Sequence, residues 1–365
     1  MTIPFFVTVQ RCSRQSIPTA GRNAPCIHFR TFCPICLCFV LISLLDTIDI
    51  RYYNVKGSKK SVHFARLKGE TFMKKVLSLV CVLLLCAALI PAAVAEEAAY
   101  TETVVSIPNG DHDIPATVCV PNGEGKFPAV VMLHGTGSNR DEAGNGYKMA
   151  APVLAEKYGI ATVRIDFMGS GDSTADYTGY TFESAVSDAA AAAAYMQTLE
   201  NIDADKIGVM GWSQGGTDAL LAAARHPELF KSLVTWAGAP DLSDMLTDEL
   251  YEEAKKNGFF VMTFDWRDSL NVSLQWCDDV ANTDVLAEFA EGYTGPVLAI
   301  HGKEDTTVDP EWSNKIVAAS KNEASKTYFI EGMDHTFNVF SEEDFHSLYN
   351  AVDATGEFFK ATLAD

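Results

Sequence analysis

Ser213 lies in a sequence context that suits a nucleophile. The segment Gly-Trp-Ser-Gln-Gly at 211–215 follows the apolar run 206–210 and precedes the alanine- and leucine-rich stretch 217–225. This order predicts a strand, a sharp turn and a helix, with glycines that leave room for a strained turn backbone. Such a turn exposes the serine hydroxyl, and the backbone N–H of Gln214 at the helix start can stabilise an oxyanion. The alternative is an ordinary strand-to-helix turn with a capping serine.

A candidate acid and a candidate base follow Ser213 along the chain. Asp305 comes shortly after the apolar run 297–300, and His335 comes shortly after the run 327–330. A serine hydroxyl is a poor nucleophile until a base takes its proton, and His335 would do this and later protonate the leaving group. Asp305 would hold the imidazole in the required tautomer and stabilise the imidazolium. The three residues therefore predict acyl transfer through a Ser-His-Asp triad.

Other residues compete for the roles of base and acid. His301 also stands at a strand end, where packing or hydrogen bonding is the simpler role. Glu304 and Asp309 are alternatives to Asp305. Because Asp309 is followed by a proline and a glutamate, it suits a helix N-cap better than catalysis. The chain order favours His335 as the base.

A second oxyanion donor is expected from the loop after the apolar strand 129–133. This loop begins with His134 and Gly135, and the next backbone N–H is that of Thr136. In this kind of loop that N–H binds the oxyanion, and each donor contributes about 3 to 4 kcal/mol in comparable enzymes. His134 is expected to shape the loop. No cofactor and no metal is required, since residues 96–365 contain neither His-Glu-x-x-His nor Cys-x-x-Cys.

The elements that must position these residues alternate between strands and helices. Strands are predicted at 102–107, 115–120, 128–133, 160–165, 206–210, 231–236, 296–301 and 326–330, and helices at 146–158, 181–199, 214–225, 310–320 and 342–361. Alternation of this kind predicts an α/β fold with a mostly parallel central sheet and helices on both faces.

The alternation fails in the acidic and aromatic segment 239–294. Helix-like patches at 243–256 and 282–291 predict a lid insertion over the strand ends. Flat aromatic walls with a few polar groups suit a planar acyl group that carries ring hydroxyls. The candidate substrate-binding residues of the lid are Trp266, Trp276, Asp265 and Gln275. The alternative is that the aromatic residues only pack the lid onto the core.

These motifs resemble those of the α/β hydrolases, and more narrowly those of bacterial cinnamoyl and feruloyl esterases and serine-aminopeptidase-like (S33-type) hydrolases. The resemblance covers about residues 100–360. It includes Asn139 and Arg140 in the loop after His134-Gly135, and the segment Arg-Ile-Asp-Phe-Met-Gly-Ser-Gly-Asp-Ser at 164–173. The chain order serine, aspartate, histidine is the one expected of this arrangement.

The chain departs from the resembled esterases at two positions. They often carry an aromatic residue where Thr136 stands and a histidine where Trp212 stands. The first difference affects the acyl pocket, so the resemblance specifies the fold more closely than the substrate.

The resemblance implies a serine hydrolase that cleaves carboxylic esters through an acyl-enzyme, with hydroxycinnamate-type esters as the expected substrates. One alternative is an aminopeptidase-like amide hydrolase with the same triad. A second alternative is a non-catalytic binding protein with the α/β-hydrolase fold. The expected partner is a small-molecule ester. The natural acyl and alcohol groups and the oligomeric state are left open.

Residues 73–95 have the pattern of a signal peptide. Met73 and two lysines precede the almost wholly apolar stretch 76–90, and a small-residue cleavage pattern ends at Ala95. A membrane anchor is the alternative, but the apolar core is shorter than the roughly 20 residues that a span needs. We therefore expect cleavage near Ala95 and a mature chain, 96–365, that is secreted or held in the periplasm or cell envelope.

Residues 1–72 are unusual because they precede a signal peptide. This stretch is basic and rich in cysteine, and it shows no convincing periodicity. We expect it to be an upstream extension and Met73 to be the true start. Whether residues 1–72 are translated is left open.

The mature chain is strongly acidic. Residues 1–95 contain 12 Lys or Arg and 3 Asp or Glu, which leaves 16 basic and 45 acidic residues and a formal net charge of −29. Such a charge disfavours binding of nucleic acid and stable association with anionic membranes.

Of nine cysteines, only Cys119 and Cys277 lie in the mature chain, so one disulfide is possible but not a disulfide scaffold. A chain of about 270 residues can bury a full single-domain core.

Overall fold

The computed structural model describes residues 98–364, which lie within one compact unit, Glu96–Asp365. The predicted signal peptide and the upstream extension lie outside the described residues. The unit is built on an eight-stranded sheet with the order β1-β2-β4-β3-β5-β6-β9-β10. Its strands are β1 (Tyr100–Asn109), β2 (His112–Pro121), β3 (Phe127–Leu133), β4 (Ala161–Ile165), β5 (Ile202–Trp212), β6 (Ser232–Trp236), β9 (Val297–Gly302) and β10 (Lys326–Ile330). Strand β2 pairs antiparallel with β1 and β4, and all other pairs are parallel.

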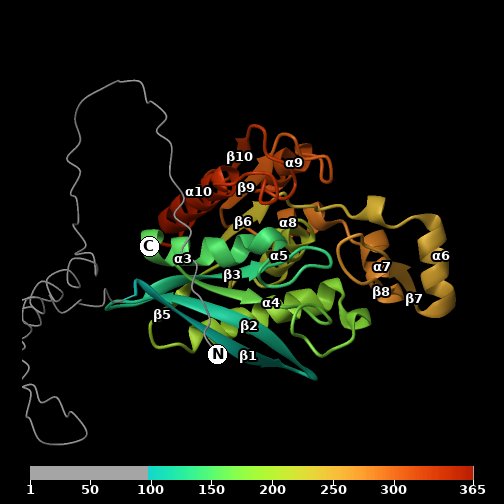
Figure 1. Cartoon of the computed structure of the whole chain (residues 1–365), viewed down its shortest axis with the longest axis horizontal. Coiled ribbons are helices and arrows are strands. Elements are labelled where there is room, and N and C mark those ends of the chain that lie inside the picture. Colours follow the sequence, from blue (N-terminus) through green and yellow to red (C-terminus); the bar gives the residue numbers. More distant parts are fainter. Residues whose placement is uncertain (1–97, 365) are drawn as a thin grey trace, which may run out of the picture. The chain divides into compact units, whose positions relative to one another are not determined.

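Helices cover both faces of this sheet (Figure 1). The helices outside the predicted lid are α3 (Gly146–Tyr158), α4 (Phe182–Gln197), α5 (Gln214–Arg225), α9 (Glu311–Ala319) and α10 (His346–Thr362), with 3₁₀ turns η1 (Ala143–Asn145) and η2 (Tyr177–Gly179). The expected α/β-hydrolase architecture, a mostly parallel sheet between helical layers, is therefore confirmed.

Strand β3 shows why the sheet has two cores. Its side chains alternate between faces, as strand geometry requires. Val130 and Met132 pack into the core that contains residues of α3 and α10, whereas Val131 and Leu133 pack into the core that contains residues of α4 and α5. A strand that is buried on both faces needs a continuous apolar run, and this is what β3 has.

The parallel strands bring the candidate triad to one edge of the sheet. Strand β5 passes into α5 with only Ser213 between them. Asp305 follows β9 by three residues, and His335 follows β10 by five. Because parallel strands end at the same edge, the three side chains come together although up to 122 residues separate them along the chain.

The segment 239–294 contains more elements than its sequence predicted. It forms η3 (Ser243–Met245), α6 (Asp248–Asn257), the antiparallel hairpin β7 (Phe259–Met262) and β8 (Leu270–Ser273), α7 (Leu274–Asn282) and α8 (Val285–Gly292). Helix α8 packs against α5, where Glu288 pairs with Arg225 at 2.6 Å. The rest of the segment extends beyond the sheet, at the right of Figure 1.

The two cysteines of the described residues are not paired. Cys119 in β2 and Cys277 in α7 are both free and buried.

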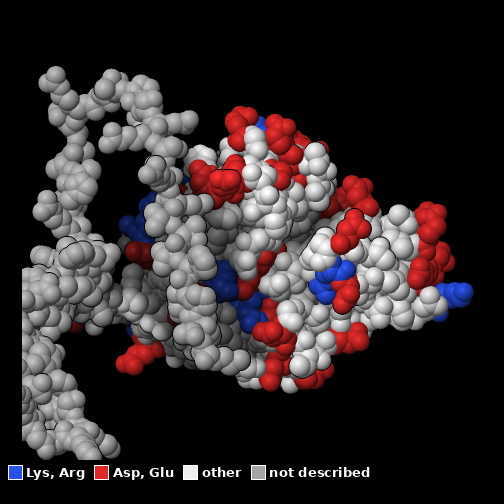
Figure 2. Space-filling view, in the orientation of Figure 1, with Lys and Arg blue, Asp and Glu red and all other residues white. Residues whose placement is uncertain are grey.

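On the face shown in Figure 2, acidic side chains gather along the outer edges, and basic side chains are few. Within residues 98–364, every helix is too short or too polar to span a bilayer.

Candidate active site

The backbone at Ser213 is strained in the way that an exposed nucleophile requires. Ser213 has φ 57° and ψ −123°, a conformation that residues with a side chain rarely adopt. Its flanking glycines have no room for a side chain. A Cβ atom on Gly211 would lie 1.8 Å from the carbonyl oxygen of Gly215, and one on Gly215 would lie 2.2 Å from that of Leu133. The sharp turn therefore depends on glycine at both positions.

The side chains of Ser213, His335 and Asp305 form a continuous hydrogen-bonded series. His335 Nε2 lies 3.1 Å from Ser213 Oγ, and His335 Nδ1 lies 2.7 Å from Asp305 Oδ2. The imidazole is thus oriented with one nitrogen toward the hydroxyl and the other toward the carboxylate. This geometry allows His335 to accept the hydroxyl proton while Asp305 fixes its tautomer.

Asp305 is held as a carboxylate. Its Oδ1 accepts the backbone N–H groups of Thr307 at 2.8 Å and Val308 at 2.9 Å. Burial by itself would raise the pKa of Asp305, but hydrogen bonds from His301 and His335 outweigh this and lower the pKa well below its usual range. An anion at this position can stabilise a positive charge on His335.

His301 supports Asp305 rather than Ser213. It is buried, and its Nε2 lies 3.0 Å from Asp305 Oδ2 and 3.0 Å from the carbonyl oxygen of Val308. Both neighbours are acceptors, so this nitrogen carries the proton, and Nδ1 accepts from the Ser313 hydroxyl at 2.8 Å. The sequence favoured a packing or hydrogen-bonding role for His301 over that of base, but it did not identify Asp305 as the partner.

The rival acids are not part of this hydrogen-bonded series, although Asp309 lines the same cavity as Ser213 and His335. Glu304 and Asp309 are both exposed. Asp309 Oδ1 accepts the backbone N–H of Glu311 at 2.9 Å, at the start of α9. Neither carboxylate has a hydrogen bond to His335 among the described contacts, whereas Asp305 does.

The loop after β3 passes directly over Ser213. A Cβ atom on Gly135 would lie 3.1 Å from Ser213 Cβ, so a side chain there would push against Ser213 and glycine favours this close approach. The Thr136 hydroxyl donates to Gln214 Oε1 at 2.5 Å. This bond ties together the two residues whose backbone N–H groups are the candidate oxyanion donors.

His134 and Glu142 hold the shape of this loop. His134 Nδ1 donates to the carbonyl oxygen of Gly135 at 2.8 Å, and its Nε2 accepts the N–H of Phe167 at 3.2 Å. Burial lowers the pKa of His134, which keeps it neutral, as these roles require. The buried Glu142 accepts from Gly135 N–H and from the Ser138 hydroxyl. Nothing in the sequence distinguished Glu142.

Two segments singled out by the family resemblance meet in the structure. The Arg140 backbone N–H donates to Asp166 Oδ1 at 2.7 Å, and its guanidinium pairs with Asp166 and with Asp172. The Asp172 N–H also donates to Asp166 Oδ2 at 2.9 Å. The loop after β4 thus anchors the loop after β3, which carries the candidate oxyanion donor.

A cavity of about 790 Å³ opens at Ser213 and His335. Its aromatic lining residues are Trp212, Phe264, Trp266, Trp312 and Phe340, and its polar lining residues include Thr136, Ser138, Asn139, Asp241, Asp244 and Thr307. The volume is in the range of small-molecule sites, and the mixed lining suits an aromatic ligand with polar substituents.

Only one of the four predicted lid contacts lines this cavity. Trp266 does, and it is 65% exposed. Trp276 is 1% exposed and packs against Phe260, which corrects the expectation that it contacts substrate. Asp265 and Gln275 are exposed and do not line the cavity, and Gln275 donates to Asp279 at 2.9 Å. Phe264, another aromatic residue of the lid segment, also lines it.

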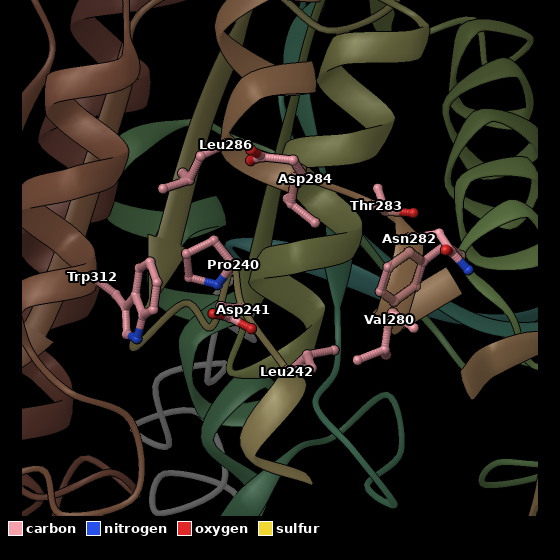
Figure 3. Close-up of a pocket in the computed structure, with 12 residues that line it drawn as sticks. Pro240, Asp241, Leu242, Val280, Asn282, Thr283, Asp284, Leu286 and Trp312 are labelled. Carbon is pink, nitrogen blue, oxygen red and sulfur yellow. The ribbon is translucent and has the colours of Figure 1, made fainter. Parts of the chain in front are cut away.

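A second cavity of about 390 Å³ adjoins the first and shares Asp241, Leu242 and Trp312 with it. Figure 3 shows Trp312 facing Pro240 and Asp241, with Leu286 of α8 and Asp284, the N-cap of that helix, above them. The shared residues place this cavity beside the candidate catalytic centre.

Comparisons with known proteins agree with this architecture. The model of the prolyl oligopeptidase family (Peptidase S9) matches residues 146–360. A 2-hydroxy-6-oxo-6-(2'-aminophenyl)hexa-2,4-dienoic acid hydrolase of Metapseudomonas resinovorans is 24% identical over 243 residues, 59% of this chain and 80% of its own. A 2,6-dihydropseudooxynicotine hydrolase of Paenarthrobacter nicotinovorans is 37% identical over 119 residues, 31% of this chain and 29% of its own. The chain thus spans less than a third of this second relative.

Among solved structures, Est1E from Butyrivibrio proteoclasticus with bound ferulic acid superposes with a TM-score of 0.57. It is 24% identical, and the match covers 72% of this chain and 100% of that one. This likeness shows the shared fold.

The family match covers more than half of the chain and includes all three residues of the candidate triad. The protein is therefore an α/β hydrolase that belongs to the prolyl oligopeptidase family.

Proposed function

We propose that this protein is a serine hydrolase that cleaves carboxylic esters through an acyl-enzyme. The observation that carries the proposal is the position of His335, whose Nε2 is 3.1 Å from Ser213 Oγ and whose Nδ1 is 2.7 Å from Asp305. Ser213 is the nucleophile, His335 the general base and acid, and Asp305 the orienting carboxylate.

The reaction proceeds in two halves. Ser213 Oγ bonds to the ester carbonyl carbon while His335 takes the hydroxyl proton, and the N–H groups of Thr136 and Gln214 bind the oxyanion. The bond to the alcohol oxygen then breaks, and His335 gives its proton to that oxygen. In the second half a water molecule replaces the alcohol, His335 takes a proton from it, and the acid leaves as Ser213 regains its proton.

The preferred acyl group in this proposal is planar and conjugated, of the hydroxycinnamate type. Support comes from Phe264, Trp266 and Trp312, which give the cavity aromatic walls, and from Ser138 and Asn139, which can bond ring hydroxyls. The names of two similar proteins point the same way, one with bound ferulic acid and one acting on an aminophenyl hexadienoic acid.

Amide cleavage is the second candidate. It is favoured by membership of a family described by its oligopeptidases, and the same triad would serve it. Here the substrate's amine nitrogen, rather than an alcohol oxygen, would receive the proton from His335.

The test compares wild type with Ser213→Ala on methyl ferulate, a short-chain alkyl ester and an aminoacyl amide. A fluorophosphonate probe should label wild type at Ser213 and should not label the variant. The variant should lose nearly all turnover with its folding intact, because only binding and oxyanion stabilisation remain. If the folded variant kept more than about a tenth of wild-type kcat, Ser213 would not be the nucleophile. Faster amide than ester turnover would favour the second candidate, and a wild type without labelling or turnover would indicate a binding protein.

We also propose that the mature protein is exported and begins near Glu96. The support is the signal-peptide pattern of residues 73–95. N-terminal sequencing of protein from the medium or cell envelope should give a terminus close to Glu96. Membrane-held protein with an intact Met73 terminus would favour an anchor instead.

A further inference from the structure

The lid touches the loop that carries a candidate oxyanion donor. The loop 263–269 joins β7 to β8 at the far end of the lid hairpin. From this loop, Arg267 Nη1 donates a hydrogen bond to the carbonyl oxygen of Gly137. Gly137 directly follows Thr136, whose N–H is the candidate donor. A side chain 130 residues away in sequence therefore contacts the backbone next to the oxyanion hole.

The contact between the two loops is close as well as polar. Gly137 has φ 69°, and a Cβ atom there would lie 2.9 Å from Phe264 Cζ and 3.4 Å from Arg267 Cδ. The Arg267 guanidinium in turn lies 5.8 Å from the centre of the Phe264 ring. Phe264 and Arg267 thus pack closely over Gly137, whose positive φ favours glycine and where a side chain would require the Phe264 ring to shift.

The charge of Arg267 also reaches the inside of this loop. Desolvation lowers the pKa of the buried His134 against opposing contributions from Glu142, Gly135 and Asp166, and the positive charge of Arg267 acts in the same direction as desolvation. His134 in its neutral form donates to the carbonyl oxygen of Gly135. The loop after β3 is therefore held at two points, by Arg267 at Gly137 and by His134 at Gly135.

We propose that Arg267 is a positioning residue for ester hydrolysis, because its bond to Gly137 fixes the Thr136 N–H and completes the oxyanion hole only when the lid hairpin is seated. This inference rests on the proposed ester hydrolase function. It makes the lid part of the catalytic apparatus and not only a wall of the substrate cavity. Packing of the lid hairpin against this loop and alignment of the Thr136 N–H then occur together.

This role has a kinetic signature. An oxyanion donor acts on the transition state, and loss of one such donor costs about 10²–10³ in kcat in comparable enzymes. A donor that is misaligned rather than lost should cost less, about 10- to 100-fold. The loss should appear in kcat and leave KM nearly unchanged, and it should be similar for aryl and small alkyl esters. A residue that only bound substrate would instead change KM, and only for substrates large enough to reach it.

The experiment measures kcat and KM for methyl ferulate and for a short-chain alkyl ester in wild type, Arg267→Ala and Arg267→Gln. Glutamine retains a donor for the Gly137 carbonyl, so Arg267→Gln should recover part of the kcat lost in Arg267→Ala. The control is Lys256→Ala, which removes an exposed cation from helix α6 of the same insertion and should behave as wild type. Urea unfolding of each variant identifies any that are not folded.

A second measurement uses an aryl trifluoromethyl ketone, which forms a tetrahedral oxyanion adduct with a reactive serine. Its affinity should fall in Arg267→Ala by about the same factor as kcat/KM, because both depend on the oxyanion donors. An unchanged kcat with raised KM, or ketone affinity equal to wild type, would overturn the proposal. Absence of ester turnover in wild type would be a failure of the proposed function itself and is visible before any Arg267 variant is compared.

Discussion

Replacing Asp218 by asparagine should raise the free energy of unfolding at neutral pH and flatten its dependence on pH. Asp218 is fully buried in α5, in the first turns of the helix after Ser213. Its Oδ2 accepts the Tyr180 hydroxyl at 2.6 Å, and its Oδ1 has no hydrogen-bond partner among the described residues. Desolvation raises the pKa of Asp218 to about 8, with a further rise from nearby Asp188 and an opposing contribution from the bond with Tyr180.

The sign of the effect follows from the two pKa values of this carboxyl group. In the unfolded chain Asp218 loses its proton near its ordinary pKa of 3.8, whereas in the folded protein it keeps the proton up to about pH 8. Between these values the folded state binds more protons, so the free energy of unfolding falls as pH rises. The slope for one proton is about 1.4 kcal/mol per pH unit. This contribution is present in full below the unfolded pKa and is lost as pH rises through the folded pKa.

Asparagine has nearly the same shape and does not titrate. Between pH 5 and pH 7 the stability of Asp218→Asn relative to wild type should therefore increase by about 3 kcal/mol, which is two pH units of this slope. Urea unfolding at pH 5, 6, 7 and 8 measures this difference directly. Parallel pH profiles for the two proteins would refute the reasoning.

Asp353→Asn is a matched control with the opposite sign. Burial by itself would raise the pKa of Asp353, but the hydrogen bonds from Lys157 and Tyr158 together outweigh it and lower the pKa. Its stabilising contribution is present above the unfolded pKa and is lost as pH falls. This variant should therefore be slightly less stable than wild type at neutral pH, and the difference should shrink toward acid pH.

The remaining predictions concern the acid and the lid. Asp305→Asn should reduce kcat by about 10⁴, as in a comparable triad, because the tautomer of the base is no longer fixed. Asp309→Asn should reduce stability by about 1 kcal/mol and leave steady-state kcat nearly unchanged, and the reverse pattern would exchange the two roles. Trp266→Ala should lower kcat/KM for methyl ferulate more than for a short-chain alkyl ester, because only the aromatic ring loses a wall. Trp276→Ala should instead cost about 3 to 5 kcal/mol in urea unfolding, and an unchanged midpoint would contradict its place in the lid core.

The sheet was predictable because its strands carry their signal locally. Strand β3 is apolar throughout, and the predicted strand 128–133 differs from Phe127–Leu133 by one residue. The helix prediction 214–225 matches α5, since glycines before it and an apolar face within it mark its start and its packing. Short, fully buried strands leave few alternatives to a sequence-based prediction.

The lid was less predictable because its elements depend on packing. Strands β7 and β8 have four residues each, and no tight turn sequence joins them. The local sequence therefore did not predict a hairpin. Trp266 and Trp276 are chemically identical, yet one is 65% exposed and the other 1%. Packing partners such as Phe260 decide which of the two tryptophans is buried and which lines the cavity. The sequence alone does not show where these partners lie.

The contact between His301 and Asp305 has a consequence for chemical rescue. Asp305 is held by His301 and by two backbone N–H groups, none of which belongs to the base. Its carboxylate should therefore keep its orientation if the His335 side chain is cut back to a methyl group. Free imidazole that binds in the space left by the His335 side chain would find the Asp305 carboxylate already oriented to accept its N–H. The Ser213 hydroxyl would already be exposed beside it. The entropy cost of ordering the Asp305 side chain is therefore incurred once, when the protein folds, and does not recur at each turnover.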